Sequence, residues 1–404
     1  MAGLSETRGP AIAAARPRVV AALAAQFRDL DLAEEAFSAA CEKALAHEGE
    51  IADLAGWLYV TGKRVALNRL RNRAAEERAI AGKATLEPMA DILHLPDPIP
   101  DERLRLLFVC CHPALALEAR VGLALKVVCG LEVAAIARGF LVAEPAMYQR
   151  ITRAKAKIRQ ANIPFETPPR RLWPERVQAI LATLELAFTL AYGDAAGAGP
   201  HAGFGEEVER LADMLAELLP DDPEVAGFAA LVKLARSREA ARIDAGGAMV
   251  PLSMQDPALW DAGRIDAARI LLDRAASARR PGPHQVLALV HFTHAKRIFG
   301  GEVDLASISR LYETLATMRG GVPVAVASAV ARSLAGSPGA GLDALDRIDP
   351  ATAATYLPYH AARADMLRRA GMVEEAAVSY RAALALQPSP AERKFLERRL
   401  ASLG

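Results

Sequence analysis

Helical periodicity along nearly the whole chain is the feature that most restricts how this sequence can fold. From Ala11 to Arg78, apolar residues recur at intervals of three and four, and Val19, Leu23 and Phe27 share one helical face. Aromatic residues, which are enriched in β-strands, make up only 5% of the 404 residues. We therefore predict an all-α protein.

Two proline-rich breaks interrupt the periodic pattern. The first contains four prolines between residues 80 and 100, and the second contains three between residues 164 and 169. Proline lacks a backbone N–H and ends helices, so each break marks a boundary. The breaks predict a helical domain over 11–79, a linker over 80–100, a second helical domain over 101–165 and a third over 171–404.

The second predicted domain contains the pattern of a helix-turn-helix. Residues 131–138 form a short helix with an apolar face, and a brief connection follows over residues 139–143. Glu144 and Pro145 then open a second helix, with an acid and a proline at the positions where helix N-termini favour them. Two short helices joined this closely are typical of the DNA-binding motif.

The second helix of this motif has an apolar stripe with cations on both sides. At about 100° per residue, the apolar residues share one narrow face: Met147, Ile151, Ala154 and Ile158. The cations fall on its two flanks: Arg150, Arg153 and Lys157 on one, Lys155 and Arg159 on the other. Such a helix suits the major groove, where cations meet phosphates on either side, although a solvated basic helix gives the same pattern.

We expect base contacts near the start of this helix. Gln149 lies beside the first flank, and glutamine can read adenine while arginine reads guanine through paired hydrogen bonds. Cations further along the helix are expected to meet phosphate. The candidate DNA-binding residues are Glu144, Met147, Gln149, Arg150, Arg153 and Lys157.

A second basic cluster follows aromatic residues in the first domain. Trp57 and Tyr59 stand just before it, and aromatic rings beside cations can stack on unpaired bases. A helix with one aromatic residue in its core and a solvated basic face gives the same pattern. The candidates here are Trp57, Lys63, Arg64, Arg69, Arg71 and Arg73.

The third domain contains the spacing of a helical repeat. Small residues, an aromatic residue and a closing proline stand at the offsets of a tetratricopeptide repeat: Gly371, Ala376, Tyr380, Ala383 and Pro388. A similar spacing occurs upstream, at Gly263, Ala268, Leu272 and Ala275. We predict a repeat-like array of helices, although alanine-rich helical hairpins also match such spacings by chance.

Several segments match the pattern of a bacterial protein family. The stretch "AGWLYVTGKRVALNRLRNR" at 55–73 places a tryptophan ahead of a basic helix, and residues 101–165 include "CCHPAL" and "RAKAKIRQANIPF". The matches continue with "MQDPALWD", "RPGPHQ" and "HAARADMLRRAG". Over almost its whole length, the sequence resembles the extracytoplasmic-function sigma factors of RNA polymerase, in the subgroup with a long tetratricopeptide-like C-terminal extension.

The resemblance implies three functional parts. Residues 11–79 correspond to sigma region two, which binds core RNA polymerase and the −10 element of promoter DNA. Residues 101–165 correspond to region four, which binds the −35 element, and residues 171–404 to a regulatory extension able to bind a protein regulator. The implied −10 contacts are the candidates around Trp57, and the implied polymerase contacts are Asp31, Glu34 and Glu35. The family is not enzymatic by itself, and no cofactor is implied.

Departures from the family pattern leave two alternatives open. In "LAEEAFSAACEKAL", Ser38 and Ala39 stand where the family has Gln and Glu, and Asn68 stands where aspartate is usual. These departures favour a sigma-like adaptor that has lost initiation and acts through protein contacts. The other alternative is a ligand-sensing helical domain fused to a DNA reader, and it depends on three histidines near residue 290.

A glycine-rich turn in the third domain is a candidate regulatory loop. Asp244, Gly246 and Gly247 form the turn, and Asp256 and Trp260 follow it. By composition alone it is only a turn. The resemblance makes it the first candidate for a regulatory contact, because a similar acidic and glycine-rich loop opens the core of the extension in that family.

Histidine and cysteine groups do not have the spacing of a strong metal site. Cys110, Cys111 and His112 are adjacent, and neighbouring residues on a helix point about 100° apart, which disfavours chelation of one ion. The histidines of the third domain stand seven and three residues apart, at positions 284, 291 and 294, with no carboxylate in the same predicted helix. We expect no metal in either place.

The remaining composition restricts location and partners. The formal net charge is +1, so nucleic-acid binding has to come from local clusters. The first residues do not have the pattern of a signal peptide, and no uncharged apolar run reaches about 18 residues. We expect a cytoplasmic protein with no membrane partner.

Overall fold

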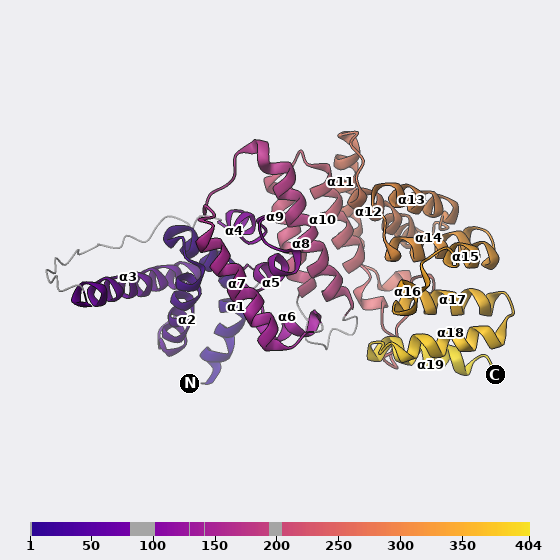
Figure 1. Ribbon diagram of the computed structural model, residues 1–404, viewed down its shortest axis with the longest axis horizontal. Coiled ribbons are helices and arrows are strands. Elements are labelled where there is room, and N and C mark those ends of the chain that lie inside the picture. Colours follow the sequence, from indigo (N-terminus) through magenta and orange to yellow (C-terminus); the bar gives the residue numbers. More distant parts are fainter. Residues whose placement is uncertain (1, 81–101, 129, 141, 194–203) are drawn as a thin grey trace. The chain divides into compact units, whose positions relative to one another are not determined.

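The computed structural model describes residues 2–80, 102–128, 130–140, 142–193 and 204–404 (Figure 1). These residues are mostly helical and contain no β-strand, and Ile243 and Met249 form an isolated antiparallel β-bridge. The all-α prediction is therefore confirmed for the described part of the chain. The expected linker over 80–100 lies almost wholly outside the described residues.

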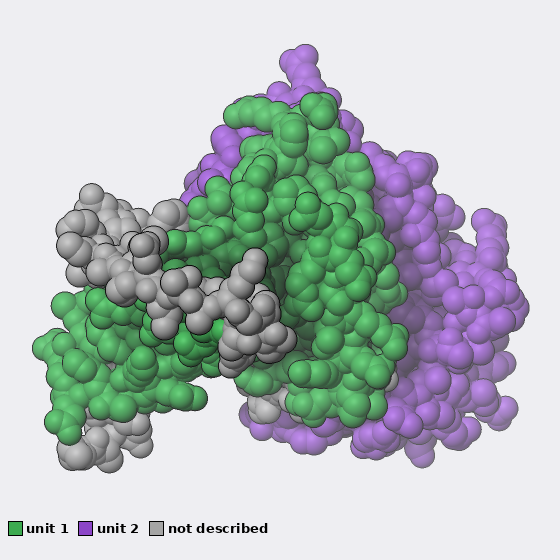
Figure 2. Space-filling model, turned by 60° about the vertical axis from the view of Figure 1, so that its left-hand side comes forward, with its two compact units in different colours: residues 1–187 green, residues 188–404 purple. Residues whose placement is uncertain are grey.

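The chain divides into two compact units, Met1–Ala187 and Phe188–Gly404 (Figure 2). Both expected N-terminal domains, over 11–79 and 101–165, lie in unit 1. The boundary between the units falls inside helix α8 (Trp173–Gly193), beyond the proline-rich break. The sequence predicted that the third domain starts at residue 171, just after the proline-rich break. No proline or glycine stands at the unit boundary within α8, so the sequence does not mark that boundary.

Unit 1 begins with three helices that pack on one another: α1 (Ala2–Phe27), α2 (Leu30–Ala46) and α3 (Leu54–Ile80). The Asp29 carboxylate caps α2, because its Oδ1 accepts hydrogen bonds from the backbone N–H groups of Asp31 at 2.9 Å and Leu32 at 3.1 Å. Leu23 and Leu58 are fully buried where these helices meet. This packing fixes the position of α2 relative to α1 and α3.

Four further helices follow in unit 1: α4 (Arg103–Cys110), α5 (Leu117–Val127), α6 (Val133–Gly139) and α7 (Glu144–Gln160). Helices α6 and α7 are the two expected for the helix-turn-helix, and both pack against α5. The predicted apolar stripe of α7 is confirmed, because all four of its residues are buried. Gly122 of α5 permits the close approach, since a Cβ there would lie 3.1 Å from the Met147 sulfur.

Unit 2 contains a series of helices in which each packs mainly on its neighbours in sequence (Figure 1). They are α9 (Phe204–Leu218), α10 (Pro223–Arg236), α11 (Ala262–Ser277), α12 (Pro283–Ala295), α13 (Leu305–Met318), α14 (Val322–Ala335), α15 (Pro338–Leu345), α16 (Pro350–Ala354), α17 (Leu357–Arg369), α18 (Val373–Ala385) and α19 (Pro390–Ala401). Such a stack is the arrangement expected of helical repeats.

The residues of the predicted repeat spacing lie where helices meet. Gly371 forms the turn between α17 and α18 with φ at +79°, a conformation that favours glycine. Ala376, Tyr380 and Ala383 of α18 are buried, and Tyr380 packs in a cluster that includes Leu396 of α19. The small and aromatic residues therefore have the packing roles that the spacing predicted.

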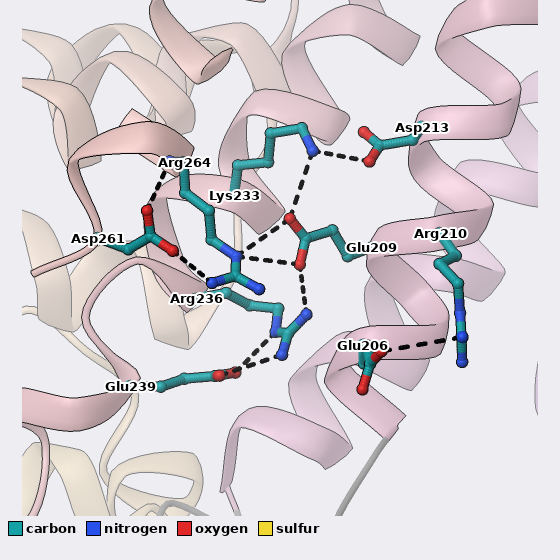
Figure 3. Close-up of polar contacts among 9 residues, drawn as sticks. All are labelled: Glu206, Glu209, Arg210, Asp213, Lys233, Arg236, Glu239, Asp261 and Arg264. Atoms are coloured by element: carbon teal, nitrogen blue, oxygen red, sulfur yellow. Dashed lines mark hydrogen bonds and ion pairs between the residues drawn. The ribbon is translucent and has the colours of Figure 1, made fainter. Parts of the chain in front are cut away.

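A buried carboxylate joins three helices of unit 2 (Figure 3). Glu209 of α9 accepts hydrogen bonds from Lys233 of α10 and Arg264 of α11, both at 3.3 Å, and pairs with Arg236 of α10. Burial by itself would raise the pKa of Glu209, but the three cations outweigh it and hold the pKa below its usual value. This cluster fixes α9, α10 and α11 relative to one another.

None of the helices in the described part of the chain is both long and apolar enough to span a bilayer.

Candidate nucleic-acid interface

One flank of α7 is open and carries four of the six expected DNA-contacting residues. Gln149, Arg153 and Lys157 are exposed and Arg150 is half-buried. Together with small and apolar residues at the start of α5, they line a groove of about 420 Å³. Among the described residues that line it there is no carboxylate, so the groove has a positive potential suited to an anionic polymer.

Contacts along the open flank hold its side chains near one another. Arg153 donates a hydrogen bond of 3.3 Å to Gln149 Oε1, which orients the glutamine amide. The Arg150 guanidinium lies 5.9 Å from the centroid of the Phe140 ring. Both interactions leave donors of the two arginines unused, because each guanidinium has five N–H groups. The flank can therefore offer several hydrogen-bond donors and one amide to a base edge or a phosphate.

Two expected contacts at the start of α7 differ in accessibility. Glu144 is exposed in the first turn, where a carboxylate favours the helix N-terminus. Met147, which we included among the DNA-binding candidates, is fully buried and packs against α5. Met147 is therefore a core residue of the helix-turn-helix, and that expectation was wrong because the residue belongs to the inward stripe.

The opposite flank of α7 is occupied by acids of α2. Lys155 Nζ lies 2.8 Å from Asp31 Oδ1 and 2.5 Å from Glu34 Oε2, and Arg159 pairs with Asp31 as well. Burial would lower the pKa of Lys155, but Glu34 and Asp31 raise it above its usual value. Only one of the two cationic flanks is therefore open to phosphate in this structure.

The three acids expected to bind the polymerase all have partners inside unit 1. Asp31 and Glu34 bind α7, and Glu34 also pairs with Arg16 of α1 at 2.9 Å. Glu35 pairs with Arg69 of α3. Sequence reasoning missed these pairs because Lys155 stands 121 residues from Glu34, and no local pattern indicates a contact over that distance.

The basic cluster of α3 does not form one continuous surface. Arg69 turns toward Glu35 on α2, whereas Arg64 and Arg73 are exposed. The Trp57 ring is half-buried, with its centroid 5.8 Å from that of His47. The remaining two candidates, Lys63 and Arg71, are half-buried and exposed respectively, and the side chain of Arg78 lies outside the described residues.

The candidate regulatory loop is fastened to the last helix of unit 2. Asp244 Oδ1 accepts hydrogen bonds from the N–H groups of Gly246 and Ala248, both at 2.9 Å, and Oδ2 pairs with Arg398 of α19 at 2.5 Å. Gly247 has φ at +75°, in the left-handed region that favours glycine. The turn residues therefore have a structural role within unit 2.

The two later residues of the same candidate set also have local partners. Asp256 caps the 3-10 helix η4 (Pro257–Leu259), and its carboxylate accepts a hydrogen bond of 2.9 Å from the Ala258 N–H. Trp260 is buried, and the Arg297 guanidinium lies 5.3 Å from its ring centroid. Both residues serve the packing of this segment.

The three histidines lie on one helix, α12, but have different partners. His284 Nδ1 is 2.8 Å from Glu224 Oε2, whereas His291 Nδ1 is 2.7 Å from Arg238 Nη2. His294 lies beside the same cavity as His291. In the described part of the chain, no group of three or more His, Cys, Asp or Glu side chains is placed to hold a metal ion.

Two cysteines of unit 1 are packed in its interior, and Cys41 is half-buried. Cys110 and Cys111 are buried, and burial raises the pKa of the Cys111 thiol to about 12. Such a thiol is protonated at neutral pH and unreactive. His112 is half-buried, and Cys129 lies outside the described residues.

Comparison with known proteins gives a family without an assigned activity. Residues 176–276, which include the cluster around Glu209, match the family described as "Family of unknown function (DUF6596)". "Uncharacterized protein R00370" of Rhizobium meliloti (strain 1021) is 38% identical over 404 residues, which cover 98% of this chain and 95% of that protein. No solved structure matches this chain. The chain belongs to the same family as R00370 of Rhizobium meliloti.

Proposed function

We propose that this protein is an alternative sigma factor of the extracytoplasmic-function type, which brings core RNA polymerase to promoters and reads the −35 element through α7. The observation that carries the proposal is the open flank of α7, where an amide and three cations line a groove, and none of the described residues that line it is acidic. The phosphodiester chemistry belongs to the polymerase, so this chain needs no catalytic group of its own.

The proposed reading of DNA divides the open flank by position. Gln149 and Arg150 lie near the helix start, where side chains of this motif reach base edges in the major groove. Glutamine can bond adenine and arginine can bond guanine through two hydrogen bonds each. Lys157 lies two turns further along and is placed to neutralise a phosphate. Trp57 and the exposed cations of α3 would bind the −10 element.

The test is binding of single variants to a set of −35 sequences at several salt concentrations. Gln149→Ala and Arg150→Ala should each relax sequence preference and cost about 1–3 kcal/mol at the matched base pair. Lys157→Ala should weaken all sequences equally and reduce the salt slope by about one unit. Gln178→Ala, an exposed glutamine of α8, is the matched control and should change neither property.

The same measurements can contradict the proposal. A uniform loss of affinity in the Gln149 and Arg150 variants would reduce α7 to a non-specific electrostatic contact. Unchanged binding in all three α7 variants would remove the helix-turn-helix from the mechanism.

A second candidate function is a sigma-like adaptor that does not initiate transcription. The observation that favours it is the pairing of Asp31, Glu34 and Glu35 with cations of unit 1, which leaves the expected polymerase contact occupied. Run-off transcription with purified core polymerase separates the two functions. A promoter-dependent transcript supports the sigma factor, and sequence-specific DNA binding without a transcript supports the adaptor.

A further inference from the structure

Unit 2 contains a cavity of about 360 Å³ that the proposed DNA and polymerase contacts do not use. Its wall is formed by the end of α8, the segment after α10, residues 249–255, α12 and α13. The volume is within the range of pockets that hold small metabolites, about 300–1,000 Å³. The polar residues in the wall are Tyr192, Arg238, Arg242, Gln255, His291, His294 and Tyr312.

Arg238 is a buried cation in the wall of this cavity. The residue is only 3% exposed, and its guanidinium bonds Leu234 O, Tyr192 Oη and His291 Nδ1 at 3.2, 3.4 and 2.7 Å. Within the described part of unit 2, no carboxylate lies at ion-pair distance from it. Buried arginines are normally paired with acids, because an unpaired buried charge is costly.

Arg242 places a second cation at the same cavity. Its guanidinium stacks 3.6 Å from the centroid of the Tyr192 ring and donates one hydrogen bond of 2.6 Å to the Tyr192 carbonyl. It too lacks an ion pair with any described residue of unit 2. Burial is the main cause that lowers the pKa of Arg242, and the like charge of Arg238 lowers it further, whereas Tyr192 and the more distant carboxylates of Glu239 and Glu392 act in the opposite direction. The fold therefore holds two cations of like charge together, an arrangement that a bound anion would stabilise.

The two histidines of the cavity are uncharged at neutral pH. Burial and then the positive charge of Arg238 lower the pKa of His291 well below its usual value, and burial with Arg238 and Arg297 lowers that of His294 to about 4. Both rings are therefore neutral at pH 7. A neutral His291 accepts the Arg238 hydrogen bond and orients the guanidinium.

Gln255 supplies an independent indication of a ligand. It is 5% exposed, and its Nε2 donates to Val250 O at 3.1 Å, but its Oε1 is buried with no hydrogen-bond partner. An unsatisfied buried acceptor costs about 1–3 kcal/mol. Because Gln255 lines the cavity, a ligand with a hydroxyl or amino donor would satisfy it.

We propose that this cavity binds a small organic oxyanion, whose carboxylate or phosphate group is held by Arg238 and Arg242 and whose hydroxyl or amino group bonds Gln255. Guanidinium groups suit this ligand class because their N–H groups match two oxygens of a carboxylate or phosphate. The site lies wholly in unit 2, so the inference does not depend on the proposed function of α7.

The experiment is isothermal titration calorimetry of the full chain at constant ionic strength. The probes are malate, a hydroxycarboxylate, and glycerol 3-phosphate, a phosphate ester, with glycerol as the neutral control. We expect saturable binding of at least one anion and none of glycerol. Binding of malate alone identifies a carboxylate site, binding of glycerol 3-phosphate alone a phosphate site, and binding of both a site for either group.

The variants use Arg242, because the loss of the buried Arg238 could unfold unit 2. Arg242→Gln should weaken binding about tenfold to a hundredfold, and Arg242→Lys, which keeps the charge but loses the paired geometry, should weaken it less. Arg269→Gln, which removes an exposed arginine of α11, is the matched control and should bind as the natural chain does. No binding of either anion by the natural chain, or equal binding by Arg242→Gln, would overturn the proposal.

Discussion

Lys155 and Lys157 stand two positions apart on α7 and have opposite environments. Lys157 is exposed on the open groove, whereas Lys155 is half-buried between Asp31 and Glu34 of α2. At about 100° per residue, two positions turn the side chain by more than half a circle. Neighbouring cations of one helix therefore have separate roles, one available to phosphate and the other joining α7 to α2.

This division predicts a gain of DNA affinity when the α2 acids are neutralised. The double variant Asp31→Asn, Glu34→Gln should release Lys155 and Arg159, because these acids are their partners. Two additional phosphate contacts would increase the slope of log affinity against log salt by up to about 1.8 units. Fluorescence anisotropy with duplex DNA at several salt concentrations measures the slope.

Glu42→Gln is the matched control for that variant. Glu42 is an exposed acid of the same helix, and its removal leaves Lys155, Arg159 and Arg69 with their partners on α2. A salt slope equal to that of the natural chain in the double variant would mean that Lys155 and Arg159 do not reach DNA even when released.

At the scale of helices, close crossings of unit 2 depend on glycine. Gly341 of α15 faces Ser333 of α14 and Met366 of α17, where an added Cβ would lie 2.5 Å and 2.7 Å from their side-chain atoms. Those distances are too short for real contacts, so the helices would have to separate. Gly339, on the same helix, has only Ser337 Oγ near it, at 3.8 Å.

The two glycines predict opposite effects of the same substitution. Gly341→Ala should lower the free energy of unfolding by about 1–3 kcal/mol through overpacking. Gly339→Ala should raise it by up to about 1 kcal/mol, because alanine loses less conformational entropy in a helix. Chemical denaturation of both variants measures the difference. A loss of stability in both variants would mean that the close contact at Gly341 is not the cause.

The Glu209 cluster predicts a pH-dependent contribution to stability. Glu209→Gln should cost about 1.5–3 kcal/mol at neutral pH, because it removes a charged acceptor from three cations. The folded pKa of Glu209 is depressed, so its contribution is present above the unfolded pKa and is lost as pH falls through the folded pKa. The difference between variant and natural chain should therefore shrink in acid.

Glu206→Gln is the control for this prediction, since Glu206 is an exposed acid one turn earlier on α9. Its loss should change the free energy of unfolding by less than about 1 kcal/mol. Thermal and urea denaturation at neutral and acidic pH measure both variants. Equal destabilisation by the two substitutions, or a Glu209 effect independent of pH, would show that the cluster is not a source of stability.

The sequence predicted helices and their inward faces better than it predicted partners. Periodicity identified the buried stripe of α7, and acid with proline identified its start, because both signals are local. The pairing of Lys155 with α2 and the meeting of Arg238, Arg242 and Gln255 around one cavity depend on tertiary packing. No spacing within a single helix contains that information.

At the scale of the whole molecule, the unit boundary inside α8 changes where the chain can be divided. The first half of α8 belongs to unit 1, and the Trp173 ring lies 5.9 Å from that of Phe108. Ile180 and Leu184 are buried as well. A cut at the prolines before α8 would therefore remove part of the core of unit 1.

This boundary predicts different behaviour of two fragments. Residues 1–193 should fold as a soluble fragment, whereas residues 1–168 should expose Phe108 and lose several buried side chains, each worth about 1.5–3 kcal/mol. At 2–4 °C per kcal/mol, the shorter fragment should melt at least about 6 °C lower. Thermal denaturation and dye binding to exposed apolar surface measure the difference. Equal melting temperatures would mean that α8 contributes nothing to unit 1.

The fastening of α19 to the loop after α10 has a consequence for how unit 2 unfolds. In an open array of helical repeats, terminal repeats fray independently, because each contacts only its neighbours. Here Arg398 pairs with Asp244, 154 residues earlier, and Lys394 donates to Gly246 O at 2.9 Å. The last helix thus closes the array into a ring of contacts, so detaching α19 breaks its contacts with this loop as well as its packing on α18. A closed array loses its terminal and its internal helices in one cooperative transition.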